Sequence, residues 1–509
     1  MLNANFDFHI HPSFKTFLGA LKEPDRKDCW KNVAFGANTC IGILNSQSSL
    51  TQMKQGNVRL AVANLLSLER PLAKNFLLQV FDSLSNQLDG EIFRKVRNQN
   101  STPEDSLSYF DLMMAELIHL VNAQTTDPNL KVKIIKSMAE FVDDDETINL
   151  ILAAEGGHNF YGELNKDEQE DNQNAILRHL GIFKRKDEQF RMFYITLVHL
   201  YTSHLGNHAF AIKLITGREF KPAGKGLTDL GKTFIKEALR ISETENRILI
   251  DIKHMSLQSR LDFYKIRKEE FPNVPIIASH IGVTGTSFRR NAIRFVDSTM
   301  SVTLNEVYFN FDLCKGLANT YFNPWSINMY LEDIEEIVVS GGLMGVSLDK
   351  RILGCEAVVA NEFLSAEETI LLRNKQRVTN IDVLKDLQAI QALDFSMAGR
   401  STNELHYLAN NILYIVRVGQ EVMINKGGVE TKLGDDIWKH ICIGSDFDGL
   451  IEPIDGFKDS SKTATLRGTL KNALIELANL SVIPINVPDN VEDLIMFDNA
   501  FAFMNKHYQ

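Results

Sequence analysis

The sequence predicts an α/β fold, a (β/α)8 TIM barrel with helical insertions. Three observations favour it: short apolar runs recur along the chain, helical segments separate them, and most runs end in histidine or an acidic residue. Alternating strands and helices are typical of a parallel barrel, whose chemistry sits at the carboxyl ends of its strands. We therefore expect a single barrel domain over residues 1–509, with insertions at about 13–50 and 350–436.

The first predicted strand spans residues 6–11 and contains two histidines. Side chains alternate between the two faces of a strand, so His9 and His11 share one face. Seven later runs are apolar and rich in β-branched residues, and they predict the remaining strands. In chain order these runs are residues 56–69, 148–154, 191–199, 247–251, 274–278, 343–348 and 441–449.

Helices are expected between these strands. Thr102 before Pro103, with acids in the first turn, predicts a helix start, and apolar periodicity carries that helix to about Asn122. Further helices are predicted at about residues 130–142, 225–240, 257–270 and 326–339, and residues 350–436 are expected to be mostly helical.

Composition and charge exclude several classes of protein. The chain is 44% hydrophobic with a formal net charge of −11, which fits a globular fold and disfavours a nucleic-acid binder. Five scattered cysteines without a Cys-x-x-Cys pair disfavour a disulfide framework and a thiolate zinc site. The sequence has no basic leader and no run of about 18 apolar residues. We expect a cytoplasmic protein without a membrane span, unless a leader was removed before residue 1.

Residues of the kind that bind metals stand where the predicted strands end. They are His9 and His11, Glu155, His199, His254, His280 and Asp446. Taken singly, each histidine fits a core position and Glu155 fits a salt-bridged turn. A carboxylate at the tip of an apolar strand must however be paired or metal-bound, since its burial alone costs several kcal/mol. Because so many strands end in this way, the pattern favours a metal site.

Five short motifs carry a resemblance to a known family. They are Glu-Gly-Gly-His from Glu155, Asp-x-x-His-x-Ser from Asp251, Pro-x-x-x-Ser-His from Pro275, Arg-Arg-Asn from Arg289 and Gly-Ser-Asp-Phe-Asp-Gly from Gly444. In this order they resemble the membrane dipeptidase (renal dipeptidase) family, the M19 peptidases of the amidohydrolase superfamily. The resemblance runs from Phe6 to about Lys458, interrupted by the two insertions.

The resemblance implies a barrel that holds two divalent metal ions, expected to be zinc. By position, it assigns one ion to His9, His11, Glu155 and Asp446, and the other ion to Glu155, His254 and His280. Two cations that share a water lower its pKa enough to supply hydroxide near neutrality. In the family, this bridging hydroxide attacks the amide carbon of a small dipeptide.

The resemblance also implies roles for individual side chains. Asp446 would take and pass on the proton, and His199 would bind the substrate and stabilise the tetrahedral oxygen. Arg290 would hold the terminal carboxylate of the substrate, a task that suits a planar, bidentate donor. The alternatives are that His199 only packs and that Arg289 reaches in instead. Asp7 is expected to orient a ligand.

Two departures from the family pattern bear on metal and substrate. The family usually has aspartate where this chain has His11, so the first ion would meet one negative charge fewer. The insertions at 13–50 and 350–436 are long for the family and bear on what fits the pocket.

Three hypotheses follow. The first is a binuclear metal dipeptidase. The second is an amidohydrolase that acts on another small amide, an N-acyl amino acid or a lactone. The third is a non-catalytic barrel relative, whose expected mark is loss of metal ligands, and none of the six metal positions holds an incompetent residue. The sequence leaves open whether the chain forms a homodimer.

Overall fold

The computed structural model gives the arrangement of most of the chain. It describes residues 4–19, 28–33, 45–74, 92, 96, 108–123, 127–162, 170–201, 203–211, 218–222, 225–289, 295–301, 306–311, 315–355, 361–365, 368, 371, 400–426 and 428–509.

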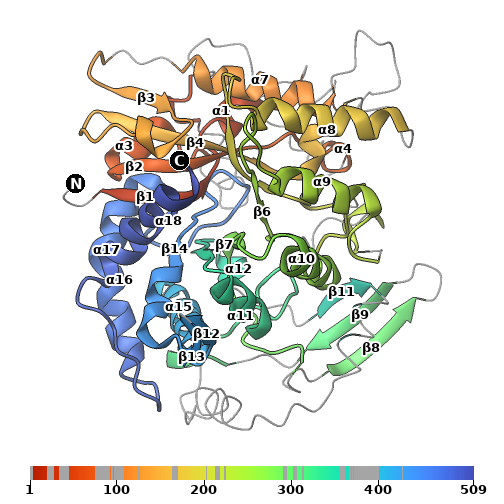
Figure 1. Cartoon of the computed structure of the whole chain (residues 1–509). Coiled ribbons are helices and arrows are strands. Elements are labelled where there is room, and N and C mark those ends of the chain that lie inside the picture. Colours follow the sequence, from red (N-terminus) through yellow and green to blue (C-terminus); the bar gives the residue numbers. More distant parts are fainter. Residues whose placement is uncertain are drawn as a thin grey trace.

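Eight parallel strands of the described residues form a barrel, which confirms the predicted fold (Figure 1). In order around the sheet they are β1 (Asn5–Ile10), β2 (Val58–Leu65), β4 (Thr147–Glu155), β5 (Met192–Thr196), β6 (Leu249–Asp251), β7 (Ile277–Ile281), β10 (Leu343–Val346) and β14 (Ile441–Ile443). The barrel closes just beyond β14, where the Asp446 amide donates to the His9 carbonyl at 3.0 Å and the His11 amide donates to the Phe447 carbonyl at 3.0 Å. The eight strands correspond to the eight predicted runs.

Helices surround the barrel strands (Figure 1). Those described are α1 (Phe14–Leu18), α3 (Leu50–Gln55), α4 (Arg70–Ala73), α7 (Tyr109–Val121), α8 (Glu170–Lys184), α9 (Asp229–Leu239), α10 (Leu257–Glu270), α11 (Leu331–Val339), α12 (Lys350–Leu353), α15 (Glu404–Gln420), α16 (Thr463–Ala478), α17 (Val491–Asp493) and α18 (Asn499–His507). Ser108, Thr228 and Ser256 cap α7, α9 and α10, because each side-chain oxygen accepts a backbone N–H of the first turn. The predicted helix start at Thr102 lies outside the described residues.

The carboxy-terminal helix completes the barrel core. Every residue of β1, β2, β4 and β5 is buried, which explains why the runs of β2, β4 and β5 are largely apolar. Phe503 of α18 packs edge-on against Phe8 of β1 and Phe193 of β5, with ring centroids 6.3 and 6.2 Å away. Burying one such ring stabilises the fold by about 1.5–3 kcal/mol. The end of the chain therefore holds the strand that carries the first two histidines.

The helix predicted at residues 130–142 is wrong. Those residues form strand β3 (Lys131–Ile134), which pairs in parallel with β4, and a short 3₁₀ turn at Met138–Glu140. The reason is visible in the alternation Lys-Val-Lys-Ile, which has the period of a strand and is rich in β-branched residues.

The described residues of the region after residue 350 include strands as well as helices. It contributes β11 (Asn361–Ser365) to a small antiparallel sheet with β9 (Glu306–Phe311) and β8 (Phe295–Ser301). Another antiparallel pair joins β12 (Met423–Lys426) to β13 (Val429–Lys432). Between these strands runs α15, which is largely buried. Much of both predicted insertions lies outside the described residues.

Within the part of the chain that the structure describes, no helix is both long and apolar enough to cross a lipid bilayer.

Candidate metal centre

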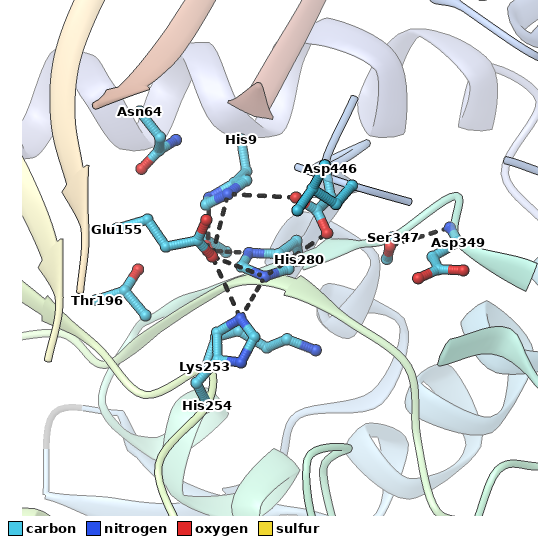
Figure 2. Close-up of polar contacts among 12 residues, drawn as sticks. His9, Asn64, Glu155, Thr196, Lys253, His254, His280, Ser347, Asp349 and Asp446 are labelled. Atoms are coloured by element: carbon cyan, nitrogen blue, oxygen red, sulfur yellow. Dashed lines mark hydrogen bonds and ion pairs between the residues drawn. The ribbon is translucent and has the colours of Figure 1, made fainter. Parts of the chain in front are cut away.

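Six of the predicted site residues converge at the carboxyl ends of the barrel strands. Figure 2 shows His9, Glu155, His254, His280 and Asp446 pointing toward one another from different strands. All of them are buried, with exposed fractions between 0% for His9 and 8% for Asp446. His11 adds a second imidazole from the end of β1, and its Nε2 lies 3.1 Å from Nε2 of His9.

Glu155 lies at the centre of this cluster. Its Oε1 is 3.2 Å from Nε2 of His254 and 3.3 Å from Nε2 of His280, while its Oε2 is 3.1 Å from Nε2 of His11. The turn after β4 makes this position possible, because Gly156 adopts φ +92° and a Cβ there would lie 2.3 Å from the His158 ring. One carboxylate therefore faces two separate sets of imidazoles.

Two of the converging residues have a strained backbone. His254 and Asp446 both have φ near +65°, a left-handed conformation that costs a residue with a Cβ about 1–3 kcal/mol. The loop after Asp446 also needs a glycine at position 449, since a Cβ there would lie 2.0 Å from Oδ1 of Asp446. Non-glycine residues held in this region occur preferentially at functional sites.

A hydrogen-bond network behind the cluster fixes how two of the imidazoles are protonated. Asp251 accepts from four donors, the Lys253 and Ser279 amides and the Thr196 and Ser279 hydroxyls. Ser279 therefore gives its only hydroxyl proton to Asp251, at 2.6 Å. The same oxygen lies 3.0 Å from Nδ1 of His9 and 2.8 Å from Nδ1 of His280, so it accepts from both rings.

Tyr194 supports the same assignment for His9. Its hydroxyl lies 2.8 Å from Nδ1 of His9 but donates to the Phe8 carbonyl, so it can only accept from the ring. The Nδ1 atoms of His9 and His280 consequently carry the protons, and their Nε2 atoms present lone pairs to the cluster. A lone pair on Nε2 is the form in which histidine binds a metal.

The buried donor set fits divalent cations. Oε1 of Glu155 and Oδ1 of Asp446 are buried and have no hydrogen-bond partner among the described residues. Burial lowers the pKa of His9 to about 4 and that of His254 to about 3, so both rings are neutral at pH 7. Neutral imidazoles and carboxylate oxygens facing one another repel unless a cation lies between them. Ligand atoms of a tetrahedral zinc site are roughly 3.3–3.6 Å apart, close to the spacing seen here.

Three groups of ligand atoms in and around this cluster are close enough to bind an ion. Two of them share Glu155: one is His9, His11, Glu155 and Asp446, and the other is Glu155, His254 and His280. These two are the sets that the family resemblance assigns to two metals. The third group is His9, Asp251 and His280, and its carboxylate already accepts hydrogen bonds from four donors.

Burial, reinforced by the negative charge of Glu155, raises the pKa of Asp446 well above its usual range. Although burial opposes ionisation of Glu155, its electrostatic interaction with His199 and the hydrogen-bonding histidines around it hold its pKa well below its usual range.

His199 lies beside the cluster and differs from the other histidines. Its Nε2 is 3.7 Å from Oε2 of Glu155, and its Nδ1 forms a short hydrogen bond with the buried carboxylate of Glu69. Burial alone would lower the pKa of His199, but the charges of Glu69 and Glu155 outweigh it and raise that pKa. When this imidazole is protonated, it donates from Nδ1 to Glu69 and presents an Nε2–H donor toward the cluster. Glu69 was not singled out from the sequence.

The other predicted residues lie elsewhere. Arg290 is outside the described residues, and the neighbouring Arg289 is exposed. Asp7 accepts from the amides of His9 and Ser445 at 3.2 and 2.9 Å, so it holds the backbone of one proposed ligand. Asp448, the second acid of its motif, accepts from the amides of residues 47 and 48 and forms an ion pair with Lys15.

A pocket opens onto the cluster and contains a residue that sequence reasoning missed. Its polar wall includes Glu155, His199, Lys253, His254, Asp349 and Asp446, and its apolar wall includes Leu200, Trp325, Ile327, Ile352 and Leu450. Lys253 is only 1% exposed, and burial lowers its pKa to about 8. A lysine next to a histidine gives no sequence signal of burial. Ser279 and Asp251, by contrast, belong to two of the motifs named above, and the motifs could have indicated that they lie near the site.

Solved structures with a similar fold include two metallopeptidases. A dipeptidase AC, described as a metallopeptidase of family M19, superposes with a TM-score of 0.52 at 12% identity, over 99% of this chain and 98% of that chain. A metallopeptidase from Rhodobacter sphaeroides, bound to a phosphinate mimic of the dipeptide L-Ala-D-Ala, superposes with a TM-score of 0.53 at 12% identity, over 99% of both chains. No protein-family model and no curated protein matches the sequence. The chain therefore shares the (β/α)8 fold of M19 metallopeptidases.

Proposed function

We propose that this protein is a metal-dependent hydrolase of the M19 dipeptidase type, with two divalent ions in its active site. One observation carries the proposal: the Glu155 carboxylate lies between two groups of imidazoles, within 3.1–3.3 Å of His11, His254 and His280. A glutamate with a purely structural role does not need three imidazoles around it. A single ion would not need the two carboxylate oxygens of Glu155 to face different imidazoles.

The proposed ligands are those of the two groups that share Glu155. Zinc is the proposed metal, because imidazole and carboxylate ligands without thiolates suit it. When bound, two such ions supply a water of lowered pKa and a Lewis acid for a carbonyl oxygen.

The protein's own side chains then complete the chemistry. Asp446 has an unpartnered buried oxygen and a raised pKa, so it is suited to take a proton from water and pass it to the leaving amine. His199 is suited to donate from Nε2 to the oxygen on which negative charge develops. Arg290 stays the proposed holder of the substrate's terminal carboxylate.

The proposed substrate is a small dipeptide, whose amide bond is cleaved. The Rhodobacter protein, which was solved with a dipeptide mimic, supports this choice through its shared fold. The alternative is another small amide, an N-acyl amino acid or a lactone, cleaved by the same metal centre. The homodimer and the cytoplasmic location stay predictions.

The test is a panel of dipeptides, N-acyl amino acids and lactones, assayed after metal analysis of the purified protein. We expect dipeptide hydrolysis that is abolished in Glu155→Ala and reduced in Arg290→Ala. If Arg290→Ala acts on every substrate as the wild type does, capture of the terminal carboxylate by Arg290 is wrong. Full activity in protein with fewer than two tightly held ions would contradict the mechanism.

A further inference from the structure

Lys253 is a buried cation whose ammonium group has no hydrogen-bond partner among the described residues. It lies just beyond β6, next to His254 (Figure 2), and it lines the same pocket as Asp446 and Asp349. Within the described part of the chain its Nζ has no hydrogen-bond partner. An ammonium group is costly to bury, and proteins normally pair it or hydrogen-bond it.

Of the nearby carboxylates, Asp349 pairs with another cation, and the other two are proposed metal ligands. Arg351 forms a two-point contact with Asp349, with Nε 3.0 Å from Oδ1 and Nη2 2.7 Å from Oδ2. Glu155 and Asp446 belong to the proposed metal centre. These groups keep the lysine in a negative surrounding, but none of them lies within 4 Å of Nζ among the ion pairs of the described residues.

Bound ions would change the charge balance of the pocket. Two divalent cations outweigh the carboxylates of Glu155 and Asp446, and Lys253 then adds one more positive charge beside them. The pocket lining also includes apolar side chains, among them Trp325 and Ile352. A ligand that satisfies both the cationic and the apolar lining residues has a carboxylate close to the reacting bond and a short apolar part.

We propose that Lys253 binds a carboxylate of the substrate and makes the pocket selective for substrates that carry one beside the scissile bond. This inference rests on the proposed hydrolase function. The carboxylate comes either from the free carboxy terminus of a dipeptide or from an acidic side chain, and the two sources can be separated by experiment.

The first experiment compares kcat/KM of the wild type, Lys253→Met and Lys253→Arg on matched substrates. The pairs are Ala-Ala with its carboxy-terminal amide, Ala-Asp with Ala-Asn, and Asp-Ala with Asn-Ala. Loss of one charge-assisted hydrogen bond lowers kcat/KM about 10- to 100-fold. In Lys253→Met we expect this loss only for the substrate of a pair that carries the carboxylate bound by Lys253, and not for its uncharged counterpart. Lys253→Arg should retain part of the activity on the charged substrate. Lys232→Met on the exposed face of α9 serves as the matched control.

The pattern of loss identifies the source. Selective loss on free Ala-Ala relative to its amide assigns Lys253 to the terminal carboxylate, and selective loss on an aspartyl substrate relative to its asparaginyl partner assigns it to the side chain. Equal losses on charged and uncharged members of every pair would overturn the proposal. If Lys253→Met does not fold, Lys253→Gln takes its place, and a circular dichroism melt checks both variants.

A second experiment does not depend on turnover. Metal-loaded protein is titrated calorimetrically with succinate and with succinamide, its uncharged analogue. We expect succinate to bind about 10- to 100-fold more weakly to Lys253→Met than to the wild type, with unchanged metal content. Equal succinate affinity in both proteins would overturn the proposal, even if no dipeptide is hydrolysed and the proposed function fails.

Discussion

Oε1 of Glu155 lies 3.2 Å from Nε2 of His254, although β5 separates the strands that carry them. This contact requires Glu155 to point across the mouth of the barrel and His254 to adopt a left-handed backbone. Two residues brought together at such conformational cost indicate a functional site, and Oε1 of Glu155, which has no hydrogen-bond partner among the described residues, fits a metal ligand.

Ser279 is expected to tune the affinity of both ions. Its hydroxyl holds the protonated Nδ1 of His9 from one metal group and of His280 from the other. Ser279→Ala removes both contacts, and losses of this kind weaken metal binding about 10- to 100-fold. A metal-competition titration with a chromogenic chelator measures the change. Ser67→Ala removes another buried serine bond, to the Tyr109 carbonyl, and should leave the affinity unchanged.

Glu69 is expected to act through His199. In Glu69→Gln the imidazole loses the charge that raises its pKa, so the donor facing the cluster weakens. We expect kcat to fall by about two to three powers of ten, as when one oxyanion donor is lost, while metal content and KM change little. Steady-state kinetics measure kcat and KM of Glu69→Gln, and metal analysis measures its metal content. A wild-type kcat in this variant would show that His199 only packs.

Asp448 is expected to stabilise the fold without joining the metal centre. It is 2% exposed and pairs with the buried ammonium of Lys15 at 3.1 Å. Removal of one partner of a buried pair costs about 3–5 kcal/mol, so Asp448→Asn should lower Tm markedly with the ions retained. Asp455→Asn, which breaks exposed contacts with Lys350 and Lys458, should change Tm little. Loss of the ions in Asp448→Asn would instead place this residue in the metal centre.

Glu116 predicts a dependence of stability on pH. Burial raises its pKa from 4.5 to about 7, so the folded state binds a proton that the unfolded state has released between these values. The free energy of unfolding therefore falls as pH rises from about 4.5 to 7 and levels off above. In Glu116→Gln this contribution is absent, which gives a gain of up to about 3 kcal/mol at pH 8 and little gain at pH 4. Thermal melts of both proteins between pH 4 and 8 measure the difference in stability. A stability gain of Glu116→Gln that grows toward acid pH would contradict a raised pKa of Glu116.

The sequence predicted the barrel and the proposed metal ligands because both leave local signals. Each strand is a short apolar run, and His9, Glu155 and Asp446 each stand at the tip of one, where parallel strands bring distant residues together. The sequence could not predict that Lys253 is buried, because its burial depends on how the loops after other strands pack over it. The helix predicted at residues 130–142 is wrong because the prediction followed the apolar residues of the whole segment. The alternation of polar and apolar residues at 131–134, which is typical of a strand, was the better signal.

Metal stoichiometry tests the central claim most directly. Protein purified without chelators, as wild type, Glu155→Ala and the matched buried variant Glu116→Gln, is analysed by mass spectrometry of its metals. A carboxylate shared by both ions predicts two tightly held divalent ions per chain in the wild type and in Glu116→Gln, and one or none in Glu155→Ala. Two retained ions in Glu155→Ala, or a fully active wild type with fewer than two, would contradict the account.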